Sequence, residues 1–346
     1  MKRYNNIFNK ICDVDNLEMA HNNARRDKIF YKEVKMVDKN KKKYLTLIQE
    51  MLINKTYKVS PYSIIKLNDK GKERVLHKLP YYPDRIIQWA IMLQIEKIFL
   101  NTFTSFTCAS MPKRGIHKAV KLMNKYLKDK ENTRYTLKMD VSKFYPSINH
   151  EILKQLLRKK IKDKDLLELL DKIVDSMEGE KGVPIGSYLS QYFANYYLAF
   201  FDHWLKEEKH CKYVVRYMDD IVIMHKSKEH LHKLREEIEE YLDKKLKLKL
   251  KQNYQVFPTD LRGVDFVGYR HFYKFKLLRK RTCNRFKNKM LKLRDKEINH
   301  SDWCSANSYK GWLKWCDSHR LKEKYINPIQ NKLNEYYKKN IKIIKI

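Results

Sequence analysis

Two adjacent aspartates, Asp219 and Asp220, are the residues of this sequence best placed to do chemistry. An apolar run, Tyr213–Val215, comes before them, and a second run, Ile221–Met224, follows them. Short runs rich in β-branched and aromatic residues predict strands, so the aspartates fall at the turn between two strands. Two like charges at the edge of a buried sheet are unfavourable without a cation, and Mg²⁺ prefers carboxylate oxygens. A solvated Asp-Asp turn is the alternative, but the tetrapeptide Tyr217–Asp220 between apolar strands is much more specific than two aspartates alone.

A third carboxylate on a neighbouring strand would complete a metal site, and Asp140 fits this role. It follows the apolar residues Leu137 and Met139, and the aromatic pair Phe144-Tyr145 comes shortly after it. Three carboxylates can hold two Mg²⁺ ions about 4 Å apart, which activate a 3′-hydroxyl and stabilise a leaving pyrophosphate. Mn²⁺ is the alternative metal. The competing interpretation of Asp140 is a helix N-cap, which the nearby pair of aspartates makes less favourable.

The charge balance indicates a polyanionic partner. The chain has 346 residues, with 75 Lys and Arg against 41 Asp and Glu, a formal net charge of +34. Nucleic acid is the first candidate partner and an anionic membrane surface is the second. Lysine dominates this excess, so a bias in genome composition is an alternative source of the charge.

Cysteine usage and hydropathy favour a cytoplasmic protein without a membrane partner. The six cysteines are widely scattered and form no CxxC pair, which argues against a zinc ribbon and a disulfide framework. The first residues contain no apolar stretch typical of a signal peptide. No run of about 18 apolar residues predicts a transmembrane helix.

The elements that must position the aspartates are a mixture of strands and helices. Turn residues and alternation predict a hairpin of Ser63–Leu67 and Glu73–Leu79, and apolar periodicity predicts several helices. The remaining expectations are a helix over 84–100 that opens at Asp84, a strand over 136–141, a helix from Asn149, a buried helix over 190–207, two strands within 212–225, a helix over 228–246, strands within 253–272, and a helical basic tail over 277–346.

Four motifs occur in an order that resembles the reverse transcriptases. They are Asp140 with its aromatic pair, the loop Gly182–Gly186 leading to Ser190-Gln191, the tetrapeptide Tyr217–Asp220, and the segment Gly263–Tyr269. The resemblance covers about residues 60–275. It implies an α+β right-hand polymerase fold, with fingers, a palm of antiparallel sheet plus helices, and a short helical thumb.

The resemblance also implies a division of the chain. Residues 1–55 would form an N-terminal basic helical region, and 56–135 the fingers, with a contribution from 151–190. Residues 136–150 and 191–272 would form the palm, and 273–346 the helical thumb.

By the same resemblance the three aspartates take the catalytic and metal-binding roles. Asp140, Asp219 and Asp220 would hold the two ions, and Asp220 is the least secure ligand because the second acid often stands slightly back in such palms. A lysine after the aspartate hairpin often protonates pyrophosphate in this family. Lys249 and Lys251 are both candidates here, and the sequence does not choose between them.

Further residues take nucleotide-binding and primer-binding roles by resemblance. Tyr145 would stack under the incoming sugar and exclude a 2′-hydroxyl, with a core aromatic as the alternative. Arg74 and, more weakly, Lys66 on the predicted hairpin would reach the triphosphate, although either could be a solvated charge. The full set of implied positions is Arg74, Lys66, Tyr145, Ile185, Gly186 and Gln191 for the nucleotide, and Gly268 and Tyr269 for a primer-grip turn.

The subfamily is indicated by the loop that opens a helix near residue 188. Ile185 stands where most reverse transcriptases carry Gln, and Ser190-Gln191 stands where most carry Ser-Pro. These departures, with Ser308–Trp312 and Trp315, resemble the reverse transcriptases of diversity-generating retroelements, a bacterial and phage group. That group copies a template RNA with errors at adenines, and works with a barrel-shaped accessory protein.

The implied partners are template RNA, a cDNA primer–template duplex, dNTPs and an accessory protein oligomer. Two alternatives keep the reaction but change its role, namely antiphage defence and a group II intron-like element. A third alternative, from a different class, is a catalytically silent basic RNA-binding protein. The presence of all three aspartates argues against this last one.

Overall fold

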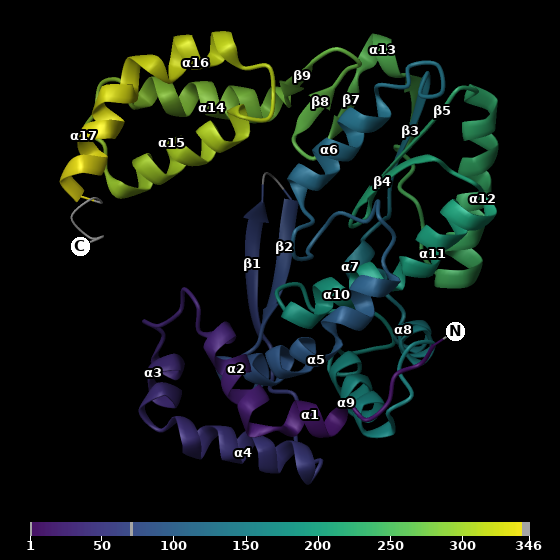
Figure 1. Ribbon diagram of the computed structural model, residues 1–346, viewed down its shortest axis with the longest axis vertical. Helices are drawn as coiled ribbons and strands as arrows, with labels where there is room; N and C mark the ends of the chain where they lie inside the picture. Colours follow the sequence, from purple (N-terminus) through teal and green to yellow (C-terminus); the bar gives the residue numbers. More distant parts are fainter. Residues whose placement is uncertain (1, 70–71, 341–346) are drawn as a thin grey trace.

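A computed structural model describes residues 2–69 and 72–340 of the protein, without the side chains of residues 69 and 72–74. Figure 1 shows a mixed arrangement in which helices surround three small antiparallel sheets. The α+β expectation is therefore confirmed. The strands are β1 (Ser63–Asp69), β2 (Lys72–Lys78), β3 (Tyr135–Asp140), β4 (Tyr213–Tyr217), β5 (Asp220–His225), β6 (Gln255–Pro258), β7 (Val264–Phe266), β8 (Tyr269–His271) and β9 (Lys276–Leu278).

The helices account for most of the described chain. They are α1 (Phe8–Cys12), α2 (Val14–Ala24), α3 (Lys32–Lys39), α4 (Lys41–Ile53), α5 (Ile86–Thr102), α6 (Ile116–Tyr126), α7 (Phe144–Ser147), α8 (His150–Arg158), α9 (Lys164–Val174), α10 (Tyr188–Tyr197), α11 (Ala199–His203), α12 (Lys228–Leu246), α13 (Thr259–Arg262), α14 (Lys280–Lys292), α15 (His300–Leu313), α16 (His319–Tyr325) and α17 (Gln330–Asn340). None of the helices among the described residues combines the length and apolar character needed to cross a membrane.

The central sheet has the strand order β4-β5-β3-β6, and all its pairings are antiparallel. Its middle strand β5 is buried on both faces, which is why its sequence is a continuous apolar run. The other middle strand, β3, alternates instead, with Leu137 and Met139 in the core and the partly buried Lys138 between them. Ile223 faces the large core that also includes α12, whereas Val222 faces a smaller core with α6. The sheet is therefore a rigid support for the turn that joins β4 to β5.

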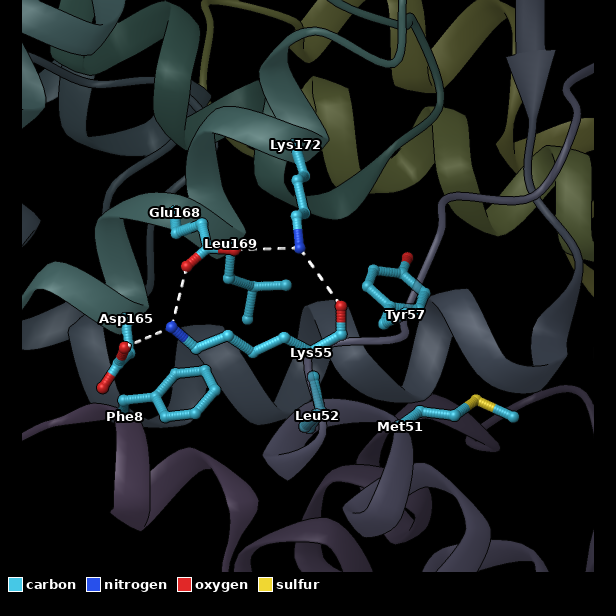
Figure 2. A pocket seen from close by; sticks show the side chains of 9 residues that line it. All are labelled: Phe8, Met51, Leu52, Lys55, Tyr57, Asp165, Glu168, Leu169 and Lys172. Carbon is cyan, nitrogen blue, oxygen red and sulfur yellow. Dashed lines mark hydrogen bonds and ion pairs between the residues drawn. The ribbon is translucent and has the colours of Figure 1, made fainter.

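The N-terminal helices pack into the main core instead of forming a separate basic layer. Leu17, Val34 and Ile48 are fully or almost fully buried, and α2 lies against α5. The end of α4 is also tied to α9, where Lys55 Nζ lies 2.7 Å from Asp165 Oδ1 and 2.9 Å from Glu168 Oε2 (Figure 2). The expected helical character of residues 1–55 is confirmed, and their apolar faces stabilise the rest of the molecule.

The predicted hairpin is confirmed, and helical backbone follows it at Asp84 as expected. Strands β1 and β2 pair from Ser63 with Lys78 onward. Asp84 lies in the π-helical segment Tyr81–Arg85, which has non-helical φ/ψ at Tyr82 and runs directly into α5. Its carboxylate accepts hydrogen bonds from Tyr57 Oη at 2.7 Å and Ser60 N at 3.1 Å. Both bonds hold the chain that enters the hairpin against α5.

The C-terminal part has a core of its own, formed by α14, α15 and the helices after them together with Tyr269 and Leu278. In Figure 1 these yellow helices lie at the opposite end of the molecule from α3 and α4. As far as Asn340 the tail is largely helical as expected, except that it begins with a strand, β9, which completes the small sheet β7-β8-β9; residues 341–346 lie outside the described part of the chain. This sheet connects the central sheet to the C-terminal helices.

Candidate active site

The pairing of β3 with β5 brings two of the predicted acids together. Asp140, the last residue of β3, lies directly opposite Asp220, the first residue of β5. Asp219 lies in the two-residue loop between Tyr217 and Asp220, and Val141 N donates a hydrogen bond to its carbonyl oxygen at 3.2 Å. Residues far apart in the sequence thus meet at one edge of the central sheet.

Burial and mutual repulsion make the two adjacent aspartates reluctant to ionise. Burial, followed by the negative charge of Asp140, raises the pKa of Asp219 to about 6. Burial also raises the pKa of Asp220 to about 6, partly offset by the positive charge of Lys138. Asp220 Oδ1 is buried without a hydrogen-bond partner, and Lys138 Nζ lies 3.9 Å from it. A cation at this edge would therefore relieve an electrostatic cost.

The structure distinguishes between the two candidate lysines. The segment around Lys249 and Lys251 runs beside the end of β3, where Lys251 N donates to Asp140 O at 2.9 Å. The Lys251 ammonium group also forms an ion pair with the Asp140 carboxylate. The Lys249 side chain is exposed to solvent. The backbone carbonyl oxygen of Lys249 accepts a hydrogen bond from Ser142 N at 2.7 Å. Lys251 is therefore the lysine at the site.

The carboxylate oxygens at this edge suit hard divalent cations, although the described side chains are not already arranged as a complete set of metal ligands. Within residues 2–69 and 72–340, no three His, Cys, Asp or Glu side chains are arranged to hold a metal ion. Asp140 and Asp219 are nevertheless close enough for the charge of one to raise the pKa of the other, and all their donor atoms are carboxylate oxygens. The orphaned Oδ1 of Asp220 adds a third oxygen close by. The residues present thus suit Mg²⁺ or Mn²⁺.

One predicted nucleotide residue, Tyr145, lies near this edge, and the loop 182–186 is bonded to it. Tyr145 lies on the one-turn helix α7, where burial and the charge of Asp219 raise its pKa. Val183 N donates to Tyr145 O at 3.1 Å, and His77 N of β2 donates to Ile185 O at 3.0 Å. The loop 182–186 is therefore hydrogen-bonded both to Tyr145 and to strand β2 of the predicted fingers hairpin.

Glycine is required at one end of that loop. Gly186 has φ +115°, a conformation that L side chains rarely adopt, and an added Cβ would lie 3.5 Å from His77 O. Its backbone is exposed, so the predicted contact with a nucleotide is sterically open. Gln191, also predicted to bind nucleotide, is exposed on the first half of α10.

A buried residue that the sequence analysis did not single out holds the start of α10. Gln88 of α5 accepts hydrogen bonds from Ser187 Oγ at 3.0 Å and from Tyr188 N at 3.2 Å. It is 3% exposed, so these bonds form in a low-dielectric environment. The available signal was a glutamine within the apolar first two turns of α5, between Ile87 and Trp89.

The two hairpin candidates remain predictions. Lys66 of β1 pairs with Val75, and Arg74 of β2 pairs with Leu67, so the two do not share one cross-strand pair. The side chain of Arg74 lies outside the described part of the chain.

The predicted primer-grip turn is a tight connection between the central part and the thumb. Val267 and Gly268 form the loop between β7 and β8, both with positive φ, as a type I′ turn requires. A Cβ at Gly268 would lie 2.3 Å from Trp312 Cζ3 of α15. Tyr269 is 1% exposed, and its hydroxyl donates to Trp312 O at 3.0 Å.

These contacts limit how Tyr269 can take part in the turn, whose primer-grip role remains a prediction. Its ring is buried against Trp312, so its side chain cannot contact a primer. Burial of Tyr269 instead fixes the position of α15 relative to the turn. Any primer contact by this turn must come from its backbone.

A cleft of about 500 Å³ is lined by Asp220, by the turn and by residues of α14 and α15. Arg279 and Arg285 contribute positive charge to its wall, and the expected thumb motif contributes Ser308, Tyr309 and Trp312. The cleft thus joins the acidic edge, the primer-grip turn and the thumb motif in one basic, open space.

Comparison with protein families gives an independent result. Residues 64–271, more than half of the chain, match the family described as reverse transcriptase (RNA-dependent DNA polymerase). The matched range begins in β1 and ends with β8, so it contains all three aspartates, Tyr145 and Ile185.

Two curated proteins show similarity to parts of the chain. It is 25% identical to protein YkfC of Escherichia coli K12 over 281 residues, which cover 69% of this chain and 72% of YkfC. It is 29% identical over 154 residues to the group II intron-encoded protein LtrA of Lactococcus lactis, covering 42% of this chain and 25% of LtrA. The chain therefore spans most of YkfC but only a quarter of LtrA.

Solved structures of telomerases resemble this fold. The telomerase of Candida albicans in complex with the TWJ fragment of telomeric RNA aligns with a TM-score of 0.51 and 12% identity, covering 84% of this chain and 55% of the telomerase. Apo telomerase from Candida tropicalis aligns with a TM-score of 0.50 and 14% identity, covering 83% of this chain and 59% of that chain. At such low identity the likeness concerns the fold alone, and this chain spans little more than half of either telomerase.

Proposed function

Because the chain belongs to the reverse transcriptase family of RNA-dependent DNA polymerases and has their right-hand fold, we propose that it extends a primer by copying RNA into DNA at the edge formed by Asp140 and Asp219. The observation that carries this proposal is the register of β3 and β5, which places Asp140 opposite Asp220 and beside Asp219. The net charge of +34 suits an RNA template and a primer–template duplex.

Asp140 and Asp219 would hold the divalent ions, with Asp220 as a more distant oxygen ligand. When bound, two such ions supply activation of the primer 3′-hydroxyl and stabilisation of the leaving pyrophosphate. Mg²⁺ is the proposed metal, since the donors are hard oxygens.

The chain's own side chains would orient the reactants around these acids. The Lys251 ammonium, already at the Asp140 carboxylate, is placed to donate a proton from Nζ to the departing pyrophosphate. Tyr145 would lie beneath the incoming sugar and exclude a 2′-hydroxyl, because its partly buried ring packs against the core and leaves little room to move. Ile185 would pack against the nascent base pair without offering a hydrogen bond.

We further propose the diversity-generating retroelement type, with frequent errors at template adenines and an accessory protein oligomer in the cytoplasm. Ile185 and the Ser190-Gln191 pair support this assignment, together with the thumb motif Ser308–Trp312. The similarity to LtrA over 42% of the chain favours a second candidate role, in a group II intron-like element.

The direct test is primer extension on a defined RNA template with dNTPs and Mg²⁺. Wild-type protein should extend the primer, and Asp219→Asn should abolish incorporation because the acids act on the reacting groups. RNA binding by the variant should stay close to wild type, since the basic surface supplies the affinity. An inactive wild type that still binds RNA would support the silent RNA-binding alternative.

A further inference from the structure

Arg216 is a buried charged residue directly before the catalytic turn, and the proposed reaction gives it no direct role. It lies on β4, has no exposed surface, and is among the largest fully buried side chains of the described chain. Its guanidinium group forms a two-pronged ion pair with Asp202, at 2.7 Å from Nε to Oδ1 and 2.6 Å from Nη2 to Oδ2. Asp202 is also fully buried, so both charges are shielded from water.

The remaining donors of Arg216 reach the turn itself. Nη1 donates to the carbonyl oxygen of Met218 at 2.9 Å and to Asn195 Oδ1 at 3.2 Å. Asp202 accepts a further hydrogen bond from Thr107 Oγ1 at 2.7 Å. One guanidinium group therefore connects α10, α11 and the loop before α6 with the turn that carries Asp219.

The turn needs such support because its backbone is strained. Met218 has φ +55°, in the left-handed region that residues with a side chain adopt reluctantly. Positive φ at only the first loop residue corresponds to a type II′ turn, in which glycine is normally preferred. A non-glycine residue persists in this conformation only where surrounding contacts hold it. The bond from Arg216 to the Met218 carbonyl is one such contact.

We propose that Arg216, held by Asp202, is a positioning residue that keeps the Met218–Asp219 turn in its left-handed conformation and so directs the Asp219 carboxylate toward Asp140. This inference rests on the proposed function for its catalytic consequence, but not for its structural part. Arginine suits the task because its planar group offers several donors in fixed directions, whereas lysine offers one compact charge.

The competing interpretation is that the pair only stabilises the core. A buried ion pair is weak support for stability, because well-packed apolar side chains of similar volume often replace it without loss. The double variant Arg216→Met/Asp202→Leu makes such a replacement and also removes the hydrogen-bond donor to the Met218 carbonyl oxygen. Arg216→Lys keeps the positive charge near Asp202 but cannot serve all the acceptors. A matched control is Arg158→Lys, which disrupts the two-pronged ion pair with Asp171 between α8 and α9.

The test is hydrogen–deuterium exchange of peptides that contain residues 217–221, in metal-free protein, together with thermal unfolding. Arg216→Lys should speed exchange in the turn by about tenfold or more, the change expected for losing one charged hydrogen bond. The double variant should show the same fast exchange even when its melting temperature returns to near wild type. Arg158→Lys should leave exchange in the turn unchanged.

Wild-type protection of the turn in a stable double variant would overturn the proposal, as would equal acceleration by Arg158→Lys. Should the double variant not fold, Arg216→Lys decides: unchanged exchange at residues 217–221 would overturn the proposal. Primer extension adds a second readout, with the Mg²⁺ concentration for half-maximal rate raised about tenfold in Arg216→Lys. An inactive wild type would refute the proposed function while leaving the exchange result to decide the role of Arg216.

Discussion

Replacing Gly268 by alanine should loosen the joint between the β7–β8 turn and the thumb. The new Cβ would lie 2.3 Å from Trp312 Cζ3 and 2.7 Å from Cη2, so the indole or the turn must move. Overpacking of this kind costs about 1–3 kcal/mol, and the φ of +90° adds about 1–2 kcal/mol for a residue with a side chain. Alanine regains about 0.4–1 kcal/mol by restricting the unfolded chain. The net destabilisation should therefore be about 1–5 kcal/mol.

Thermal unfolding and the length of primer-extension products measure the two consequences. The melting temperature should fall by several degrees, and products should shorten because the turn and Trp312 line the cleft beside Asp220. Gly311→Ala is the matched control on α15, where an added Cβ meets nothing within 4 Å. It should stabilise the helix by up to about 1 kcal/mol.

A second variant tests the contact itself. Combining Gly268→Ala with Trp312→Leu should cost less than the sum of the two single changes, because the leucine side chain leaves room for the new methyl group. Strict additivity, or a Gly268→Ala protein as stable as wild type, would refute the argument that Trp312 requires glycine at this turn.

Three other predictions follow from the site. Tyr145→Ala should admit ribonucleotides, and unchanged discrimination between rNTPs and dNTPs would place the sugar gate elsewhere. Ile185→Gln should lower misincorporation opposite template adenine by roughly 5- to 150-fold, if the restored polar contact contributes about 1–3 kcal/mol; cDNA sequencing measures this, and equal error rates would locate infidelity in other residues. Burial, with the charge of Lys276, lowers the pKa of His271 to about 3. As the pH falls, His271 is therefore protonated in the unfolded state before it is protonated in the folded state. The free energy of unfolding then decreases as the pH drops below about 6.5. His271→Phe should remove about 2 kcal/mol of the loss between pH 8 and pH 5, and denaturant unfolding showing the same loss in both proteins would contradict this.

The sequence by itself determined which residues carry the chemistry and which elements hold them. The apolar runs around Asp219 and Asp220 are buried on both faces of the sheet, so their composition alone predicted strands. The leucines at helical spacing predicted α12 with its observed bounds, because one apolar stripe must face the core. Local pattern is enough where burial of a single element decides its conformation.

Tertiary structure alone decided which distant residues meet. An isolated antiparallel bridge between Val141 and Leu250 places Lys251, and not Lys249, against Asp140, although the two lysines lie in one basic run. The packing of α15 buries the Tyr269 side chain and leaves no room for a Cβ at Gly268. Arg216 gave no signal in the sequence, because its partners Asn195 and Asp202 are distant in the chain and approach it only when α10 and α11 pack behind β4. Side-chain contacts of this kind depend on how elements pack, which no local spacing specifies.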